Sequence, residues 1–324
     1  MKFPTKIKPM LCQVTERPFN SAQFIFEPKF DGERIIAFLN KKRKKIFVKL
    51  QTRNFKIVTF RYPEIEKELK KVKVKDLILD GEIVAFNKKG KPSFKLLQKR
   101  IGLFSKSEIQ QVSKEIPVFY FVFDILWLDG KDLKEKKLIE RKEILKKILN
   151  SSSLFLRITP FVEEKGILFF NKVKKAGFEG IVAKRKESSY LEGKRTKDWQ
   201  KIKAYLVQEF VIGGWTEGRG ARKGKFGSLL LGVYEGEKLI FVGHVGTGFD
   251  EKTLLDLKTK LKKIEVKRPP FDSIPFTNQT PHWVKPVLVC QVKFQKWTDS
   301  KLRIPVFQGL RFDKLPIECK RELK

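Results

Sequence analysis

Cysteine, histidine and long apolar runs are all scarce in this 324-residue sequence. The three cysteines are too few and too scattered for a disulfide framework or a zinc site. The two histidines, His244 and His282, lie too far apart in the sequence to suggest a metal site. No apolar stretch is long enough to span a bilayer, and residues 1–6 lack the apolar core of a signal peptide. These absences favour a cytoplasmic protein in a reducing compartment.

Acidic residues are scarce relative to basic ones. The chain has 71 Lys and Arg residues against 37 Asp and Glu residues, so its formal net charge is +34. A field of this sign attracts polyanions and speeds their capture. A thermophilic composition would also be rich in lysine, but there the lysines would be balanced by acids. No basic amphipathic segment that could bind a membrane surface stands out. We therefore expect nucleic acid, and not a membrane, as the partner.

One lysine lies between two predicted strands, in Glu27-Pro28-Lys29-Phe30-Asp31-Gly32-Glu33-Arg34. The flanking runs, 24–26 and 35–38, are apolar and typical of strands. One interpretation is a hairpin tip whose charges face water. The other is a nucleophilic Lys29, which requires a cation, a metal or a dry pocket to lower its pKa. Arg34 is a cation close to it in the sequence.

A second acidic pattern is Asp80-Gly81-Glu82, which we interpret as the junction of two short strands within residues 74–86. Residues two apart in a strand point the same way, so both carboxylates would share a face. Such a pair suits a hard cation such as Mg²⁺. A charged hairpin corner has the same pattern.

Two further strands carry charges at regular spacing. Glu179 lies at the start of a predicted strand that runs to Lys184. In Trp199-Gln200-Lys201-Ile202-Lys203, the alternation places Lys201 and Lys203 on one face. Two lysines so placed can hold a phosphate, or they can protect an exposed sheet edge.

The remaining periodicity separates the chain into two regions. Up to about residue 206 it predicts strands that alternate with helices. From residue 207 the strands shorten and glycines multiply, which fits a small β-barrel with one helix at 251–264. The helices predicted in the first region span 63–71, 94–101, 133–149 and 167–176. The basic, glycine-rich stretch 213–227 lacks P-loop spacing and is interpreted as a mobile loop that meets DNA phosphates.

Together these segments resemble the ordered motifs of the ATP-dependent DNA ligases, within the covalent nucleotidyltransferases. The motifs are Lys29–Arg34, Thr52-Arg53-Asn54, Leu79–Glu82, Phe121–Asp124, Glu179–Lys184 and Trp199–Lys203. Residues 283–294 and 309–314 are similar to the end of the OB domain in bacterial ligases that join double-strand breaks. The resemblance covers nearly the whole chain. It departs at Phe55, where the break-joining ligases usually have glycine.

The resemblance implies an α+β fold with two domains. Residues 1–206 would be a nucleotidyltransferase (adenylation) domain of antiparallel sheets with helices, and residues 207–324 an OB-fold β-barrel. The hinge between them would lie near residues 204–208. The resemblance therefore implies the minimal two-domain form of the family.

The resemblance also implies roles for single residues around the nucleotide. Lys29 would be the nucleophile that carries AMP. Glu27 and Phe123 would hold adenine, with Val182 over the other face of the base. Arg34 would contact the ribose or a phosphate.

The other implied roles concern the phosphates and the metal. Lys201 and Lys203 would act in catalysis by holding the α-phosphate, and Arg53 would contact the nucleotide and later the 5′-phosphate of the nick. The acids assigned to the ribose and the metal are Asp80, Glu82 and Glu179. The residues assigned to the outgoing pyrophosphate are Arg311, Asp313 and Lys314.

The expected activity is therefore sealing of 5′-phosphate/3′-hydroxyl nicks in duplex DNA, with ATP and Mg²⁺ or Mn²⁺. We expect a monomer in the cytoplasm, associated with the nucleoid, with an end-binding protein or a polymerase of break repair as partners. One alternative is an RNA ligase or capping-type nucleotidyltransferase, which shares the lysine chemistry. The other is a non-catalytic nucleic-acid-binding protein, against which the three acids argue, since a phosphate site gains nothing from anions.

Overall fold

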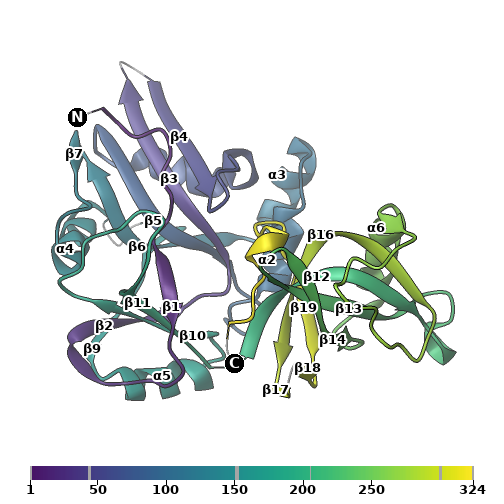
Figure 1. Cartoon of the computed structure of the whole chain (residues 1–324). Helices are drawn as coiled ribbons and strands as arrows, with labels where there is room; N and C mark the ends of the chain where they lie inside the picture. Colours follow the sequence, from purple (N-terminus) through teal and green to yellow (C-terminus); the bar gives the residue numbers. More distant parts are fainter. Residues whose placement is uncertain (1, 43–44, 150–152, 205, 299–300, 323–324) are drawn as a thin grey trace. The chain divides into compact units, whose positions relative to one another are not determined.

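The computed structural model describes residues 2–42, 45–149, 153–204, 206–298 and 301–322. The chain divides into two compact units, residues 1–204 (unit 1) and 205–324 (unit 2). Unit 2 begins with strand β12, Leu206–Glu217 (Figure 1). Residue 205, inside the predicted hinge, lies outside the described residues. Among the described helices, none has the length and apolar character needed to cross a membrane.

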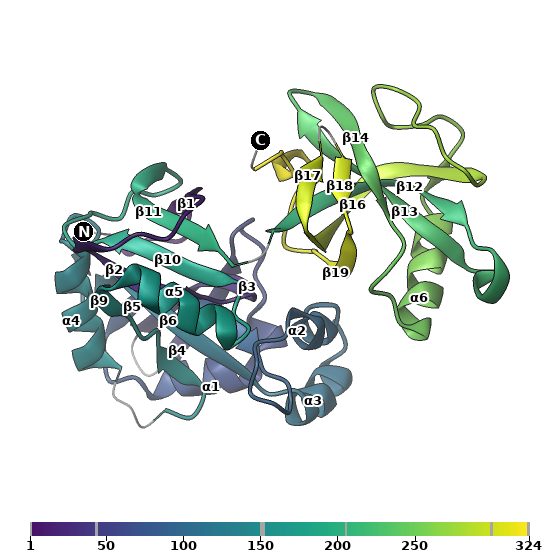
Figure 2. The same cartoon turned by 90° about the horizontal axis from the view of Figure 1, so that it is seen from below.

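Sheet A of unit 1 has the strand order β1-β11-β10-β2-β9. One face packs against helix α5, Gly166–Lys175, through Phe24, Phe26, Val173 and Ile181 (Figure 2). Gly177 adopts a φ of +86° just after this helix, as the sequence predicts. The strands are β1 (Leu11–Val14), β2 (Ser21–Lys29), β9 (Val162–Glu164), β10 (Gly180–Arg185) and β11 (Arg195–Lys203).

Sheet B of unit 1 has the strand order β4-β3-β5-β6-β7, and β8 pairs in parallel with β6. Its strands are β3 (Glu33–Lys42), β4 (Lys45–Thr52), β5 (Asp76–Ala85), β6 (Val118–Leu128), β7 (Lys131–Asp132) and β8 (Leu156–Ile158). Apolar residues of one face, such as Ile35 and Leu79, share the largest core with helix residues. The helices are α1 (Pro63–Lys71), α2 (Phe94–Ile101), α3 (Lys106–Glu115) and α4 (Leu138–Ile148).

Most predicted elements of unit 1 are present, but the start of one helix differs and another helix was not predicted. Helix α4 starts at Leu138, not at residue 133, because the Leu133 amide donates a hydrogen bond to the Leu126 carbonyl in an extended segment. Helix α3 was not predicted. Ile109 is its one fully buried residue, so its apolar pattern is weak.

The interpretation of Asp80-Gly81-Glu82 as a junction between two strands was wrong, because the three residues lie inside the continuous strand β5. A Cβ on Gly81 would lie 2.5 Å from Cε2 of Tyr120, so the glycine is needed for packing against β6. The register with β6 shifts at this point. A glycine inside a strand therefore marks an irregularity and a close approach here, not a turn.

Unit 2 is built from a sheet with the order β14-β13-β12-β16, to which β15 and β19 add by pairing with β16. The Phe307 amide of β19 donates a hydrogen bond to the Thr247 carbonyl, just beyond β14, so the two ends of the sheet meet. This is the closed order of a five-stranded OB barrel. Its other elements include β13 (Phe226–Glu235), β14 (Lys238–Val245), α6 (Glu251–Lys262), β15 (Glu265–Val266), β16 (Pro281–Phe294) and β19 (Val306–Leu310), and a separate two-stranded sheet is formed by β17 (Lys296–Thr298) and β18 (Lys301–Arg303).

The closest backbone approach in sheet A occurs at Gly180, and it yields a test. An added Cβ would lie 2.0 Å from the Ile202 carbonyl oxygen, and φ is +148°. We expect Gly180→Ala to destabilise unit 1 by about 3 kcal/mol or more. The matched control is Gly90→Ala, where φ is +70° but no atom lies within 4 Å of the added Cβ. That change should cost about 1–2 kcal/mol. Thermal unfolding and hydrogen exchange of the β10 amides measure both, and equal losses would contradict the packing argument.

Candidate functional site

The predicted site residues of sheet A lie on one face, because of the strand register. Directly paired residues of antiparallel strands share a face, as do residues two apart along a strand. One row across the sheet is Lys203–Gly180–Lys29, and the next is Lys201–Val182–Glu27. Trp199 and Lys184 form a third row on the same face. We call this side the inner face, because Trp199 packs there with Ile36, Phe38 and Ile78 of sheet B.

Lys29 is the last residue of β2, and its ammonium forms an ion pair with the Glu179 carboxylate. Burial lowers the pKa of Lys29, but Glu179, Asp31 and Glu82 more than offset this and raise it above its ordinary value. The side chain keeps 21% of its surface exposed. The raised pKa favours the ammonium form of Lys29, and the amine could act as a nucleophile only once the field of these carboxylates is offset.

The turn after Lys29 depends on Gly32. A Cβ at this position would lie 2.2 Å from the Ile83 carbonyl oxygen and 2.8 Å from Cγ of Glu82. The turn therefore packs closely against β5, and Glu82 of β5 lies near enough to Lys29 to raise its pKa. The next residue, Glu33, is buried and accepts a hydrogen bond from the Tyr62 hydroxyl, so it belongs to the core.

Arg34 does not act on Lys29 as the sequence suggested. Its Nε and Nη2 donate to the two carboxylate oxygens of Asp80 at 3.0 and 2.6 Å, and its Nη1 donates to the Met10 carbonyl at 2.7 Å. Burial lowers the pKa of Arg34, but Asp80 raises it above its ordinary value. The charge of Arg34 is therefore neutralised by Asp80 and is not directed at the lysine.

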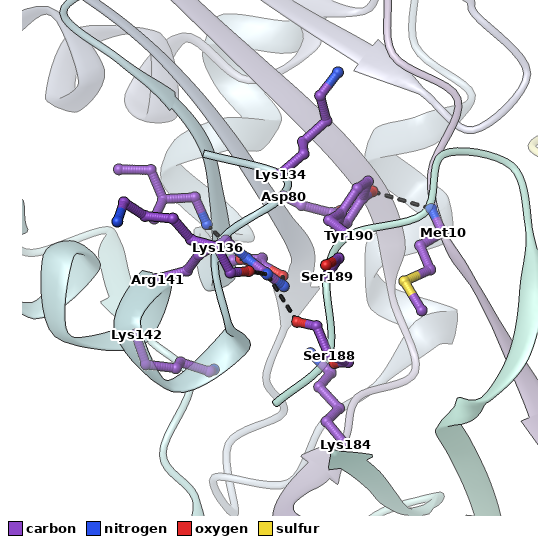
Figure 3. Close-up of polar contacts among 12 residues, drawn as sticks. Met10, Asp80, Lys134, Lys136, Arg141, Lys142, Lys184, Ser188, Ser189 and Tyr190 are labelled. Carbon is purple, nitrogen blue, oxygen red and sulfur yellow. Dashed lines mark hydrogen bonds and ion pairs between the residues drawn. The ribbon is translucent and has the colours of Figure 1, made fainter. Parts of the chain in front are cut away.

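The metal role predicted for Asp80 is not supported. Asp80 is fully buried, and besides Arg34 it accepts a hydrogen bond of 2.7 Å from the Tyr190 hydroxyl. Tyr190 in turn accepts a hydrogen bond from the Met10 amide at 3.0 Å (Figure 3). Both polar backbone groups of Met10 are thus held by this network. Removing one partner alone typically costs about 3–5 kcal/mol, because the other charge is then left buried and uncompensated.

Glu27 is buried and pairs with two lysines that were not predicted as site residues. One carboxylate oxygen contacts the Lys142 ammonium of α4, and the other lies 2.7 Å from Nζ of Lys184. Burial, and then repulsion by Lys184, lower the pKa of Lys142 despite Glu27. Lys184 could have been found as the last residue of the Glu179–Lys184 segment. Lys142 carried no local signal, because its helix has lysines on several sides.

Phe123 of β6, predicted to stack on adenine, lies on the inner face with two cations beside its ring. Nζ of Lys184 is 4.0 Å from the ring centroid, and Cζ of Arg34 is 5.3 Å from it. Lys184 also lies 4.1 Å from a Trp199 ring centroid. Cations over aromatic rings are attracted by the ring quadrupole. A base that stacks on Phe123 would have to share the ring with these cations or displace one of them.

The three acids predicted as a metal site do not come together. Among the described residues, no three His, Cys, Asp or Glu side chains are grouped closely enough to hold a metal ion. Asp80 is separated from the others by its burial under Arg34. Glu82 and Glu179 remain as candidate metal ligands, because both lie near enough to Lys29 to raise its pKa. Mg²⁺ is commonly bound by one or two carboxylates together with substrate phosphates, and this pair suits that mode.

Arg53 lies in the turn after β4, half-buried. The turn is closed by hydrogen bonds from the Phe55 amide to the Thr52 carbonyl and from the Lys56 amide to the Thr52 hydroxyl. Phe55 adopts a φ of +62°. It thus adopts the left-handed conformation that glycine favours, at a cost of roughly 1–2 kcal/mol.

Arg311 and Lys314 lie in unit 2, beyond β19. Nε and Nη2 of Arg311 donate to the Asp313 carboxylate at 2.9 and 2.8 Å, and both residues are buried. Burial raises the pKa of Asp313, but Arg311 holds it below its ordinary value. Nζ of Lys314 lies 3.8 Å from Glu209. These residues form a charged cluster of their own within unit 2.

The basic loop of unit 2 uses part of its charge internally. Nη1 of Arg222 donates to the carbonyls of Gly227 and Gly246 at 2.8 and 2.7 Å. Lys225 forms an ion pair with Glu251. These contacts tie the loop to β13, to the residue that follows β14 and to α6.

Known proteins share this architecture and sequence. Residues 9–203 match the family model described as ATP dependent DNA ligase domain, and residues 222–314 match the ATP dependent DNA ligase C terminal region. The chain is 35% identical over 319 residues to the multifunctional non-homologous end joining protein LigD of Mycolicibacterium smegmatis, covering 97% of this chain and 40% of that protein. It is 30% identical over 332 residues to a DNA ligase of Methanococcus aeolicus, covering 97% of this chain and 56% of that protein.

A solved structure of mycobacterial DNA ligase D complexed with ATP and MES superposes with a TM-score of 0.70 and 32% identity, covering 97% of this chain and 98% of the other. The α+β fold predicted from the sequence is therefore confirmed. The chain spans about two fifths of the length of the LigD protein it matches.

The Lys29–Glu179 pair can be tested through the reactivity of the amine. Without the Glu179 charge, burial becomes the dominant influence, so Glu179→Gln should lower the pKa of Lys29 and let the neutral amine react at lower pH. The pH dependence of its modification by trinitrobenzenesulfonate, followed by peptide mass spectrometry, measures this. Glu140→Gln, which removes an exposed partner of Lys136, is the matched control. Identical Lys29 profiles in the wild type and Glu179→Gln would contradict the assignment.

Proposed function

Because the chain belongs to the ATP-dependent DNA ligase family, we propose that it seals nicks in duplex DNA through a Lys29–AMP intermediate. Unit 1 would be the adenylation domain and unit 2 the OB-fold domain. The observation that carries the proposal is the inner face of sheet A, where Lys29, Lys201 and Lys203 lie in adjacent rows with Glu179 beside the nucleophile.

In the first step, Nζ of Lys29 attacks the α-phosphorus of ATP. A phosphorus–nitrogen bond forms, the bond to the bridging oxygen breaks, and pyrophosphate leaves. Lys29 must first lose a proton, and Glu179 is its hydrogen-bond acceptor. Lys201 and Lys203 would stabilise the negative charge that develops on the phosphate oxygens. Two lysines on one face are well suited to an anion that spans two rows of a sheet.

Glu82 and Glu179 would hold Mg²⁺ or Mn²⁺ together with phosphate oxygens of the nucleotide. The metal would supply positive charge beside the α-phosphate. A cation that engages Glu179 also removes the field that keeps Lys29 protonated. Glu179 would thus restrain the lysine in the free protein and release it when the nucleotide is bound.

The base would lie between the inner faces of the two sheets, near Phe123 and Val182. Glu27 offers a carboxylate that can accept a hydrogen bond from the amino group of adenine, and its ion pairs with Lys142 and Lys184 hold that carboxylate in place. Arg34 would contact the ribose or a phosphate from its place over Phe123. We infer that these contacts favour ATP.

The later steps transfer AMP to DNA. The 5′-phosphate of the nick attacks the lysine-bound AMP, and Lys29 leaves as the amine. The 3′-hydroxyl then attacks the activated 5′-phosphate, and AMP departs. Arg53 would contact the 5′-phosphate, and Arg311, Asp313 and Lys314 would act on the outgoing pyrophosphate of the first step.

The similarity to LigD supports a role in joining double-strand breaks. An end-binding protein and a polymerase would be the partners there. We propose that the protein acts as a monomer in the cytoplasm, associated with the nucleoid. DNA would be bound through its backbone and shape, so the affinity should fall steeply as salt rises.

The proposal is tested by labelling the protein with α-labelled ATP and Mg²⁺. The wild type should acquire label, and the label should pass to nicked DNA as the nick closes. Lys29→Ala should acquire none. Lys137→Ala, which removes an exposed lysine paired with Glu187, should behave as the wild type.

Three outcomes discriminate between the alternatives. Label that forms and never seals DNA would redirect the search to RNA substrates. Absence of label, from folded protein that did not arrive adenylated, would refute the lysine chemistry and leave a nucleic-acid-binding protein. Label on Lys29→Ala would place the nucleophile elsewhere.

A further inference from the structure

Arg61 stands out among the basic side chains of unit 1. It is the last residue of the 3₁₀ turn η1, Thr59–Arg61, and only 8% of its surface is exposed. Its Nε is buried without a hydrogen-bond partner, and no carboxylate of the described residues lies within ion-pair distance of its guanidinium. Buried donors are normally paired, so an unpaired one requires an explanation.

Two aromatic rings hold the guanidinium in place of an anion. Its Cζ lies 5.5 Å from the Phe60 ring centroid and 5.2 Å from that of Phe104. Phe60 is 47% exposed and Phe104 is 75% exposed. Phe104 belongs to the link between α2 and α3, which lie next to each other at one end of unit 1 (Figure 2). Two segments about forty residues apart thus converge on one cation.

The backbone under this cluster is firmly anchored. Nη2 of Arg100 donates to the Arg61 carbonyl at 2.7 Å, and Nη1 donates to the Ile116 carbonyl at 2.8 Å. Arg100 is fully buried and also pairs with both oxygens of Glu64. The backbone that carries Arg61 is therefore held before any ligand arrives, which reduces the conformational entropy lost on binding.

The chemistry of the cluster favours a phosphate with an apolar neighbour. A guanidinium presents a planar set of donors that matches phosphate oxygens, while aromatic rings can contact a sugar or a base. Lys99 near the end of α2 and Lys106 at the start of α3 are exposed and flank Phe104 in the sequence, and one exposed acid, Glu108, follows in the first turn of α3. Together with the net charge of +34, the two lysines favour a polyanion.

The cluster is separate from the nucleotide site. The adjacent Tyr62 packs in the core shared by α1, α2 and one face of sheet B. The residues around Arg34, Asp80 and Phe123 lie on the opposite face of that sheet. A ligand at Arg61 is therefore not the ATP that reacts with Lys29.

We propose that Phe60, Arg61 and Phe104 form a DNA-backbone subsite that grips the duplex beside the nick. Arg61 binds one phosphate, and the two rings pack against the adjoining sugars. The inference rests on the proposed ligase function, because that function supplies duplex DNA as the ligand. It adds a contact outside the motif residues that surround Lys29.

The test measures the affinity of adenylated protein for a fluorescent nicked duplex at about 50–200 mM NaCl. Over this range the affinity falls measurably with each phosphate contact that the protein makes. Arg61→Ala should weaken binding roughly tenfold, as expected for a charge-assisted hydrogen bond. It should also reduce the slope of log K against log salt by about 0.9, the value for one phosphate contact. Phe104→Ala should weaken binding by a smaller factor without changing the slope, because a ring carries no charge.

Matched controls separate a specific contact from the general field. Lys147→Ala removes one unit of charge from an exposed position of α4, and Phe47→Ala removes a ring that is 54% exposed on β4. Both should bind as the wild type does. Arg61→Lys keeps the charge without the planar donors, and it should recover the salt slope but only part of the affinity. Thermal unfolding of each variant verifies the fold.

Two results would overturn parts of the scheme, and they are distinguishable. Formation of the lysine adduct needs no DNA, so a wild type that never labels with ATP would refute the proposed function, whatever Arg61 does. A wild type that labels and seals, while Arg61→Ala binds DNA with unchanged affinity and slope, would refute the subsite. That second result would assign the exposed rings to contact with a protein.

Discussion

The close approach of β10 to β11 at Gly180 is the constraint on which the site depends. No side chain fits at that point, since an added Cβ would fall 2.0 Å from the Ile202 oxygen. The approach aligns Lys203 and Lys29 in one row on either side of the glycine. It also places Glu179, the residue before Gly180, beside the Lys29 ammonium. Lys29, its carboxylate partner and the lysines proposed to hold the phosphate are thus all positioned by this one contact between the two strands.

Buried charge surrounds this centre and is almost entirely paired. Arg34 with Asp80 forms one pair, and Glu27 with Lys142 and Lys184 forms another group. Taking such groups out of water costs several kcal/mol per ion, so they do not serve stability better than apolar residues would. These pairs instead orient the charged side chains, because a buried ion pair is stable in only a few geometries. A nucleotide that enters meets charges that are already fixed in place, which lowers the reorganisation required during reaction.

The two units have different architectures, but both contain a buried arginine–aspartate pair. Unit 1 uses two sheets to enclose an inner face of lysines and acids, with helices on the outer faces. Unit 2 closes a small barrel through the contact between Phe307 and Thr247, and keeps a buried Arg311–Asp313 pair next to β16. In both, an arginine is paired in bidentate fashion with an aspartate, whose two carboxylate oxygens match the planar guanidinium.

The sequence by itself determined the family, the fold class, most strands and helices, and the shared face of Lys201 and Lys203. These depend on local periodicity, motif order and alternation, which short stretches of chain contain. The tertiary structure alone decided how the charges pair. Arg34 and Asp80 are 46 residues apart, Glu27 and Lys142 are 115 apart, and Lys29 and Glu179 are 150 apart. No local pattern contains such pairings, because they arise from strand register and helix packing. For the same reason, Asp80 was predicted as a metal ligand yet lies buried under Arg34, and Lys142 was not noticed on a lysine-rich helix.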